Sequence, residues 1–510
     1  MRVSLRRCPP TSALFMDYLD SWPRVQSFYS RPYSIESIEQ FARSRPSLEP
    51  DHRRRLCAVL ADQQTVFGGS QRGVEKLAAG AVAVVTGQQP VLFTGPLFSV
   101  FKAVSAIKLA QKLEDAGIKA VPVFWVAAED HDYAELESTW VLNRNSELSR
   151  IAVDLSGTDP APAGWLEFKE DVLGAVSECL ARLPQSEFLP ELQAILESSY
   201  KPGVSPVRAF ACMMASLFRN TELTLVDPLH SELKAIAQPV VTAAIRKNSE
   251  MRSALMSRNA ELSAAGYHEQ VKVDQNFTGL FGYQGRARKV LRPDQLGNGI
   301  AWSPNVLMRP LVQDALLPTV TYIAGPAEIA YFAQAAAIYK TLDRPMPPIF
   351  PRISATLIEP RIARIMEKYS LGVEDVFQGR DSLRRKLVSA SEDDQNFTRV
   401  KANLEAQFES LRPTLAAADE TLSGALDTAR QKVLHQLDSL HGKYVHAVAR
   451  RNETLERHLD AMCNSLFPEK KQQERVLNIS SFIARYGLES IPRLLNSLSL
   501  DSREHQVVEL

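Results

Sequence analysis

Four consecutive ionisable residues, Glu129-Asp130-His131-Asp132, directly follow a short apolar run and are well suited to acid–base chemistry. His131 has an ordinary pKa near neutrality, so its ring can accept a proton from a reacting group, with Asp130 or Asp132 orienting it. A hydrated loop at a strand end would carry the same residue types. That alternative is favoured for any single carboxylate, whereas a functional role is favoured for the cluster as a whole.

A glycine-containing turn forms a second candidate site. The apolar run from Ala81 to Val85 predicts a buried strand, and Gly87 and Gly95 would let backbone amides approach a ligand. From Ser99 onward, apolar residues recur at helical spacing, so a helix N-terminus that favours an anion faces the same place. Neither GxGxxG nor GxxxxGK[ST] is present, and the turn alone is equally compatible with a structural role. The candidate ligand contacts are Thr86, Gly87, Gln88, Gln89, Thr94, Gly95 and Lys102.

Two later segments repeat the pattern of a strand followed by polar residues. Residues 318–332 predict a strand, a Gly-Pro turn and a helix, with Gly325, Pro326, Glu328 and Tyr331 as candidate contacts. Glu328 would also complement the helix dipole without any ligand. After the apolar run 346–351, Arg352 and Ser354 suit a phosphate group, although Ser354 or Thr356 as a helix N-cap is the structural alternative.

The elements that position these residues predict an α/β fold with a parallel sheet. A strand near 81–85, a helix from residue 99 and a strand near 120–126 make one right-handed βαβ unit, and residues 223–227 add a further buried strand. In open parallel sheets the ligand crevice lies beyond the carboxyl ends of the strands, where these polar clusters would meet. The sequence therefore predicts one site built from several strand ends.

The expected organisation inserts two segments into this core and appends a helical arm. Residues 144–201 have the composition of a loop-rich insertion, as in 157–164. Residues 250–315 form a second insertion that is partly strand-like, as in 267–283. This second insertion could close over the crevice as a lid, although 274–278 could equally be a surface turn. The expected parts are a helical segment (1–80), core (81–143), first insertion (144–201), core (202–249), second insertion (250–315), core (316–375), helical hairpin (376–464) and a C-terminal segment packing back on the core (465–510).

The helical arm shows apolar residues at spacings of three and four. Two seams are expected, with the turn between Arg412 and Glu420 and a second helix from about Thr421 to Cys463. Such a helix would span about 65 Å at 1.5 Å per residue, too long to bury its seam on the core. We therefore expect a partner helix, and a homodimer is the economical arrangement. The seam residues are Leu404, Phe408, Leu411 and Leu415, then Leu422, Leu426, Ala429, Val433, Leu437, Leu440 and Tyr444.

Composition favours a cytoplasmic enzyme that binds small molecules. The 510 residues include 59 basic and 59 acidic side chains, so no global field favours nucleic acid, and tRNA is not an expected partner. The five cysteines are scattered without CxxC spacing, and no signal peptide or membrane span is recognisable. No spacing calls for zinc, and Asp130 with Asp132 offers only a thin case for Mg²⁺.

Several blocks of this sequence resemble the BshC family, the cysteine ligases of bacillithiol biosynthesis. The resemblance runs in order through nearly the whole chain. The blocks are Thr86-Gly-Gln-Gln-Pro, Thr94-Gly-Pro-Leu-Phe, Phe124-Trp-Val-Ala-Ala-Glu-Asp-His-Asp132, Gly325-Pro-Ala-Glu-Ile-Ala-Tyr331, Phe350-Pro-Arg-Ile-Ser-Ala355 and Gln473-Glu-Arg-Val-Leu-Asn478.

This resemblance implies a Rossmann-like core similar to class I aminoacyl-tRNA synthetases, with a coiled coil that supports a dimer. It implies that L-cysteine is joined through its carboxyl group to the amine of glucosaminyl-malate. ATP, alone or together with Mg²⁺, is the expected cofactor, and an acyl-adenylate or acyl-phosphate is the expected activated form. The histidines and lysines of the synthetase signatures are absent, and Arg352 and Lys102 are the cations available in their place. In this hypothesis His131 is the base that accepts the amine proton.

Two other functions fit the same features. One is a non-catalytic nucleotide- or metabolite-binding scaffold whose coiled coil recruits the true ligase, motivated by the missing signature residues. In that case Glu129, His131 and Arg352 would be replaceable. The other is an amide ligase for a different amino acid or amine, which keeps the fold and changes the pocket.

Overall fold

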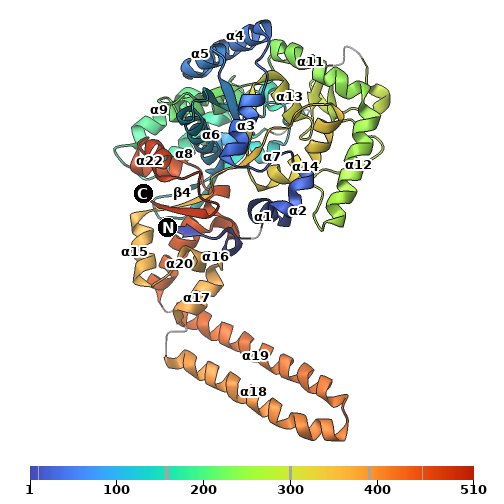
Figure 1. Ribbon diagram of the computed structural model, residues 1–510. Coiled ribbons are helices and arrows are strands. Elements are labelled where there is room, and N and C mark those ends of the chain that lie inside the picture. The colour runs from blue at the N-terminus through green and yellow to red at the C-terminus, as the bar shows by residue number, and fades with distance from the viewer. Residues whose placement is uncertain (10, 156–159, 298–300, 389–391, 451) are drawn as a thin grey trace.

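The computed structural model describes residues 1–510 except 10, 156–159, 298–300, 389–391 and 451. A large α/β body carries a long helical hairpin that projects from it (Figure 1). Among the helices of the described residues, none combines the length and the apolar character needed to cross a membrane.

In the described part of the chain, five parallel strands form the central sheet in the order β11-β10-β2-β3-β6. The parallel pairing confirms the predicted α/β class. Strands β2 and β3 pair from Val82 opposite Ala120 to Gln88 opposite Val126, so their carboxyl ends reach the same edge. The bounds are β2 Val82–Gln88, β3 Ala120–Val126, β6 Thr224–Val226, β10 Thr319–Ala324 and β11 Ile349–Pro351.

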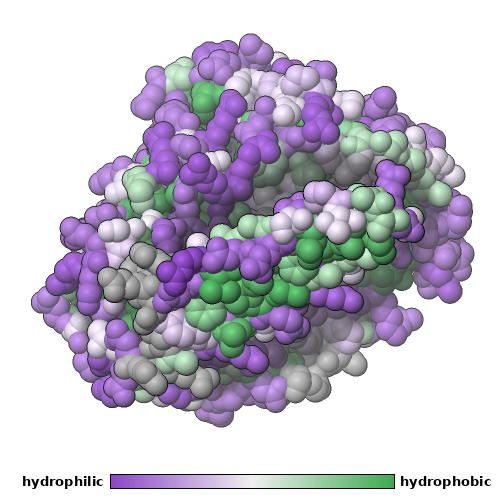
Figure 2. Space-filling view, turned by 90° about the horizontal axis from the view of Figure 1, so that it is seen from below, coloured by the Kyte–Doolittle hydropathy of each residue, from purple (hydrophilic) through white to green (hydrophobic). Residues whose placement is uncertain are grey.

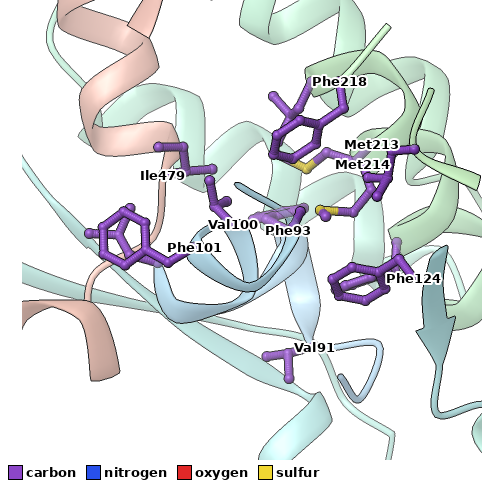
Figure 3. Packing of buried hydrophobic residues seen from close by; sticks show 14 of the residues in the cluster. Val91, Phe93, Val100, Phe101, Phe124, Met213, Met214, Phe218 and Ile479 are labelled. Carbon is purple, nitrogen blue, oxygen red and sulfur yellow. The ribbon is translucent and has the colours of Figure 1, made fainter. Parts of the chain in front are cut away.

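Both faces of this sheet are covered by helices. Along β3, Phe124 belongs to one hydrophobic cluster, and Val123 and Trp125 belong to another on the opposite face. Burial on both faces explains why these strands are continuous apolar runs in the sequence. Figure 3 shows part of the first cluster, where Phe93 and Phe124 lie near methionines of α10. The first cluster includes α3 (Ile35–Ser44), α6 (Phe98–Asp115) and α10 (Pro206–Leu217), and the second includes α1 (Ala13–Asp20), α4 (Pro50–Phe67), α5 (Arg72–Ala78), α11 (Ser231–Arg246) and α14 (Pro326–Thr341).

The first insertion is more helical than expected. A hairpin of β4 (Ser138–Leu142) and β5 (Leu148–Ala152) leads to α8 (Asp171–Arg182) and α9 (Leu189–Ser199). The expectation of a loop-rich segment is therefore wrong for 171–199. Val172 and Val176 of α8 are buried at a spacing of four, a signal that the surrounding Ser, Pro and Gly residues obscured. Residues 156–159, which include part of the stretch 157–164 quoted above, lie outside the described residues.

The second insertion combines helices with a small antiparallel sheet. Its strands are β7 (Leu280–Gln284), β8 (Ala287–Val290) and β9 (Trp302–Pro304), in the order β8-β7-β9, flanked by α12 (Asn248–Ala264) and α13 (Arg309–Leu316). The strand character expected for 267–283 begins only at Leu280. The N–H of Asn276 donates to the Asp274 carboxylate at 2.9 Å, so this stretch forms the surface turn given as the alternative.

The two chain termini lie in one small sheet (Figure 1). β1 (Arg2–Val3) pairs antiparallel with β13 (His505–Glu509), which pairs parallel with β12 (Ala355–Ile358). Helices α15 (Pro360–Lys368), α16 (Val373–Phe377) and α20 (Glu453–Leu466) share a third hydrophobic cluster beside this sheet. From the C-terminal segment, α21 (Ser480–Tyr486) packs against α9 and β4 of the main body.

The projecting arm is a hairpin of α18 (Glu392–Ala418) and α19 (Leu422–Arg450), reached through α17 (Arg380–Val388). Its turn lies at 419–421, at the end of the predicted interval, because Pro413 is accommodated inside α18. The prediction of one helix to Cys463 is wrong, since Asn452 caps a separate helix, α20. The 29 residues of α19 span about 43 Å at 1.5 Å per residue.

Several large apolar side chains of the hairpin remain exposed in the single chain. Leu411 and Leu440 are 51% and 56% exposed, and Val400, Leu422 and Val433 are also exposed. Viewed from below, hydrophobic residues gather in a band on the surface (Figure 2). Between the two helices, Lys401 donates to Asp438 at 2.8 Å and Arg412 to Asp427 at 2.8 Å.

Candidate active site

A cavity of about 640 Å³ opens beyond the carboxyl ends of β2, β3 and β10. Residues from all four predicted strand-end clusters meet in its wall, as the rule for open parallel sheets requires. The predicted residues that line it are Gly87, Gln88, Gln89, Lys102, Glu129, Asp130, His131, Gly325, Pro326, Glu328, Tyr331 and Arg352.

The turn after β2 is held against β3. A Cβ atom on Gly87 would lie 2.7 Å from the Trp125 carbonyl oxygen, so the close approach of the neighbouring strand requires glycine here. The side chain of Lys102, from α6, donates to the Gly87 carbonyl oxygen at 2.7 Å and to Gln88 Oε1 at 3.0 Å. The backbone of this turn is therefore fixed from beneath by a buried cation.

Lys102 and Glu328 form a buried ion pair in the cavity wall. Their side chains are 4% and 17% exposed, and Lys102 Nζ lies 2.6 Å from Glu328 Oε2. Glu328 also accepts from the backbone N–H of Gly325 at 2.6 Å and from the Tyr322 hydroxyl at 2.8 Å. Glu328 thus caps the start of α14, which agrees with the alternative that it complements the helix dipole without a ligand. Burial lowers the pKa of Lys102, and its three N–H donors are occupied by Gly87, Gln88 and Glu328.

Four arginines line the same cavity, and Arg288 is one of them. Arg309 donates to the Tyr331 hydroxyl at 2.9 Å, and its guanidinium lies 5.0 Å from the centre of the Tyr322 ring. Arg352 is fixed by Glu474, which accepts from Nη2 at 2.6 Å. Among the described residues, the side chain of Arg475 has no hydrogen-bond or ion-pair partner, and it lines this cavity and a second one. Among the residues that the structure describes, Arg475 therefore keeps all of its side-chain donors for an anionic ligand.

The four residues Glu129 to Asp132 lie in different environments in the structure. Glu129 is 6% exposed and forms an ion pair with Lys234 of α11, whose ammonium lies 4.2 Å from the centre of the Trp302 ring. Asp130 accepts from Gln89 Nε2 at 2.6 Å and from the backbone N–H of His131 at 2.7 Å. Asp132 is exposed and does not line the cavity. Proximity in sequence therefore does not place all four carboxylate and imidazole groups together.

The geometry gives no support to Mg²⁺ at Asp130 and Asp132. Both carboxylate oxygens of Asp130 accept hydrogen bonds within the chain, and Asp132 points outside the cavity lining. In the described residues, no group of three or more His, Cys, Asp and Glu side chains could hold a metal ion. The residues present at this cluster therefore do not fit a resident metal.

Four predicted contacts lie elsewhere. The hydroxyl of Thr86 donates to the Ile323 carbonyl oxygen at 3.0 Å inside the sheet. Thr94 and Gly95 form a buried turn with positive φ angles of 70° and 67°. Asn478 holds this turn by donating to the carbonyl oxygen of Gly95 at 2.8 Å. These three residues do not line the cavity, and their observed contacts are structural.

Ser354, the fourth, lines a neighbouring cavity of about 520 Å³. Its hydroxyl lies 3.1 Å from Glu474 Oε1 and 2.8 Å from His505 Nδ1. This second cavity shares Pro326, Ala327, Arg352 and Arg475 with the first, and Lys470, Lys471 and Arg503 add positive charge to its wall. The two cavities are therefore separated by a wall that contains two arginines.

Sequence reasoning missed several residues of the main cavity. Arg288, Asn305 and Arg309 come from the second insertion or the helix after it, and Arg475 comes from the C-terminal segment. No local motif marks them, because each is brought to the strand ends by chain packing. The block around Gln473 to Asn478 was the only signal, and it did not distinguish ion pairing from ligand contact.

Comparisons with known proteins agree with this architecture. Residues 1–298 and 294–353 match the model described as bacillithiol biosynthesis BshC, N-terminal Rossmann-like domain, and residues 355–510 match the BshC C-terminal coiled-coil domain. A protein of Koribacter versatilis named "Putative cysteine ligase BshC" is 36% identical over 100% of this chain and 99% of its own length. A protein of Solibacter usitatus with the same name is 33% identical over 98% of each chain.

One solved structure, titled as a putative arginyl-tRNA synthetase from Campylobacter jejuni, aligns with 88% of this chain and 98% of its own at 11% identity. Its TM-score is 0.23. The family models and the full-length relatives, by contrast, cover both parts of the molecule. This chain belongs to the BshC family of bacillithiol biosynthesis.

Proposed function

We propose that this chain is an ATP-dependent ligase that forms an amide bond between the carboxyl group of L-cysteine and the amine of glucosaminyl-malate. We place the reaction in the cavity beyond β2, β3 and β10. Family membership and the name of the full-length relatives support a cysteine ligase. Glucosaminyl-malate and ATP are the substrate and the cofactor that the resemblance to the BshC family implies.

The observation that carries the proposal is the distribution of charge around the cavity. Its wall holds guanidinium groups together with carboxylates, namely those of Arg288, Arg309, Arg352 and Arg475 and of Glu129, Asp130, Glu135 and Glu328. Guanidinium groups bind carboxylates and phosphates, which cysteine, malate and a nucleotide all carry. Carboxylates suit the sugar amine, which must lose a proton as the amide forms. One cavity thus offers partners for every charged group of the proposed reaction.

The cations differ in what they can contribute. Lys102 has its three donors occupied by the wall, so we assign it to fixing the turn at Gly87 and Gln88. Arg352 lines the cavity and is held by Glu474 through Nη2 and by the Ile353 carbonyl oxygen through Nη1, so only part of its five N–H donors is used within the chain. Arg475 is uncommitted, and we assign it the main contact with an anionic ligand.

Mass spectrometry of the purified protein with L-cysteine, glucosaminyl-malate, ATP and Mg²⁺ tests the proposal. We expect the cysteinyl amide to form together with AMP or ADP. The variant Arg475→Gln should lower turnover by at least tenfold, as expected when a charge-assisted bond to a ligand is lost. Arg219→Gln is the matched control, because Arg219 pairs with Glu191 at the surface and lines neither cavity.

Product with another amine or amino acid, but not with these substrates, would contradict the assigned specificity. Binding of cysteine and nucleotide without any product would instead support the scaffold function, in which the coiled coil recruits a separate ligase. Equal turnover in Arg475→Gln and Arg219→Gln would leave the reaction standing and remove the assigned role of Arg475.

We also propose that two copies of the chain pair through the α18–α19 hairpin. The exposed Leu411 and Leu440 support this, since an isolated two-helix arm leaves them in water. Light scattering coupled to size exclusion should give twice the mass of one chain. The double variant Leu411→Asp/Leu440→Asp should give a single chain, whereas Lys432→Asp, which changes charge on the same helix, should not. A monomeric mass for the unaltered chain would exclude the dimer.

A further inference from the structure

Arg288 reaches the main cavity from the second insertion and is held by its small sheet. Its Nε donates to the Ser303 hydroxyl at 2.8 Å and its Nη2 to the Pro304 carbonyl oxygen at 2.8 Å, both on β9. Its guanidinium carbon lies 3.7 Å from the centre of the Phe281 ring on β7. The residue is 8% exposed, so this guanidinium has one fixed orientation.

The remaining edge of Arg288 faces the imidazole of His131. Nη1 of Arg288 lies 3.0 Å from Nδ1 of His131. A guanidinium has donors and no acceptor, so Nδ1 must be the unprotonated nitrogen of the ring. In a neutral imidazole the single proton then resides on Nε2. The contact thus determines a tautomer that neither residue determines alone.

We propose that Arg288 is a positioning residue that fixes His131 as the Nε2–H tautomer, so that His131 donates a hydrogen bond in the cavity instead of accepting a proton. Its only ring acceptor, Nδ1, is engaged by Arg288. The hypothesis that His131 is the base is replaced by this role, and proton acceptance passes to a carboxylate of the cavity. The donor role rests on the proposed function, whereas the tautomer does not.

The net effect of the surroundings of His131 is to lower its pKa, which also favours the neutral ring. Partial burial and then the Arg288 cation lower the pKa of His131, and they outweigh Asp130 and Asp132, which raise it. Asp130 Oδ1 lies 4.0 Å from Nδ1, beyond hydrogen-bond distance. The Phe281 ring, 5.9 Å from the imidazole centre, adds no charge. His131 is therefore neutral at physiological pH and ready to donate.

The contact also couples two separate parts of the chain. Arg288 lies on β8, and its backbone N–H donates to the Pro160 carbonyl oxygen of the first insertion at 2.8 Å. His131 follows β3 of the core. The second insertion therefore lines the cavity and also supplies a polar group that sets the state of a core residue.

Nitrogen NMR of protein labelled in its histidine rings tests the tautomer directly. The His131 signals are assigned by their loss in His131→Gln. We expect a protonated Nε2 and an unprotonated Nδ1 in the unaltered protein at neutral pH. In Arg288→Gln, we expect the two tautomers to mix and the pKa of His131 to rise, because a cation and a donor to its lone pair are removed.

Arg286→Gln is the matched control. Arg286 lies in the turn of the same hairpin and donates to the Trp165 carbonyl oxygen, away from His131. It should leave the tautomer and the pKa unchanged. Acylation of His131 by diethyl pyrocarbonate, followed by mass spectrometry, gives a second measure. The reagent attacks the unprotonated nitrogen, so Arg288→Gln should react several-fold faster than either the unaltered protein or the control.

A proton on Nδ1 in the unaltered protein, or a charged ring at neutral pH, would overturn the proposal without any variant. Equal acylation rates in Arg288→Gln and Arg286→Gln would also overturn it. Neither readout depends on turnover, so an inactive preparation would count against the proposed ligase reaction and not against the tautomer. Where the enzyme turns over, the acid limb of its pH profile should move to higher pH in Arg288→Gln.

Discussion

The central sheet and the projecting hairpin are both built from regular apolar patterns, but the sheet buries its apolar side chains and the hairpin leaves several exposed. Phe124 of β3 is fully buried and Trp125 is 1% exposed, whereas Leu411 and Leu440 of the hairpin are 51% and 56% exposed. The sheet has helices on both faces, whereas the hairpin helix α19 packs against α18 and, beyond the hairpin, against α17 and α20. An apolar seam therefore predicts burial only where the same chain supplies a second layer.

Charged pairs differ in the same way between the two regions. The Lys102–Glu328 pair in the cavity wall is almost excluded from water, while the side chains of Lys401 and Asp438 in the hairpin are 41% and 53% exposed. Removing one partner of a buried pair leaves an uncompensated charge, and removing one partner of an exposed pair leaves a solvated one. The four sets of variants below compare buried with exposed positions.

The largest loss of stability is expected for Phe124→Ala. Removal of a fully buried ring from a packed interior costs about 3–5 kcal/mol of unfolding free energy. Denaturant titration followed by tryptophan fluorescence measures it. Leu440→Ala, studied in the dilute monomeric protein, should lower the unfolding free energy by less than about 0.5 kcal/mol. Similar losses for both would contradict the contrast between the two regions.

Lys102→Met should cost about 3 kcal/mol, because Glu328 would keep its charge without the cation beside it. The double variant Lys102→Met/Glu328→Gln should recover part of that loss, since the neutral amide no longer needs a counter-charge. Thermal unfolding of the two variants compares them. If the double variant is less stable than the single one, the pair contributes through hydrogen bonding more than through charge.

Acid should destabilise the C-terminal sheet through His505. This ring is buried between the hydroxyls of Ser354 and Thr356, and burial lowers its pKa. Because the folded pKa lies below the unfolded value, the unfolded state binds the proton first, and stability is lost as pH falls below about 6.5. The loss at pH 5 is at most about 2 kcal/mol.

Unfolding of His505→Gln between pH 7 and pH 5 measures this contribution. The variant should show a flatter dependence on pH than the unaltered protein. His435→Gln, on the exposed hairpin, should keep the original slope. Equal slopes in all three proteins would assign the acid sensitivity to other groups. The carboxyl of Glu474, whose pKa the Arg352 cation holds below its ordinary value despite burial, would lose its contribution only at lower pH.

The smallest effect is expected for Lys401→Ala. Its ion pair with Asp438 is exposed, so the loss should stay below about 1 kcal/mol and disappear at high salt. Thermal unfolding at low and high salt measures it. A larger loss that persists in salt would mean that this part of the hairpin is covered by another chain.

The strands of the central sheet were readable from local sequence, whereas their order in the sheet was not. Short β-branched runs end in polar clusters, and the parallel sheet brings those ends to one edge, so Gly87, Glu129 and Gly325 were expected together. The loop-rich expectation for the first insertion failed because turn residues outnumbered a helical pattern of buried positions. Thr94 and Gly95 were misplaced because a ligand turn and a packing turn use the same residues.

The sequence by itself determined the α/β core, the helical arm and the family, because these depend on local patterns and long motif blocks. Tertiary structure decided which charges are free. The donors of Lys102 are all used by the cavity wall, whereas those of Arg475 are not. Arg288, which is 157 positions from His131 in the sequence, contacts Nδ1 of that ring and so fixes which nitrogen carries the proton. The reason is that the hydrogen-bond partners of a side chain are set by how the chain packs. The spacing of residues along the sequence does not show which donors are already used.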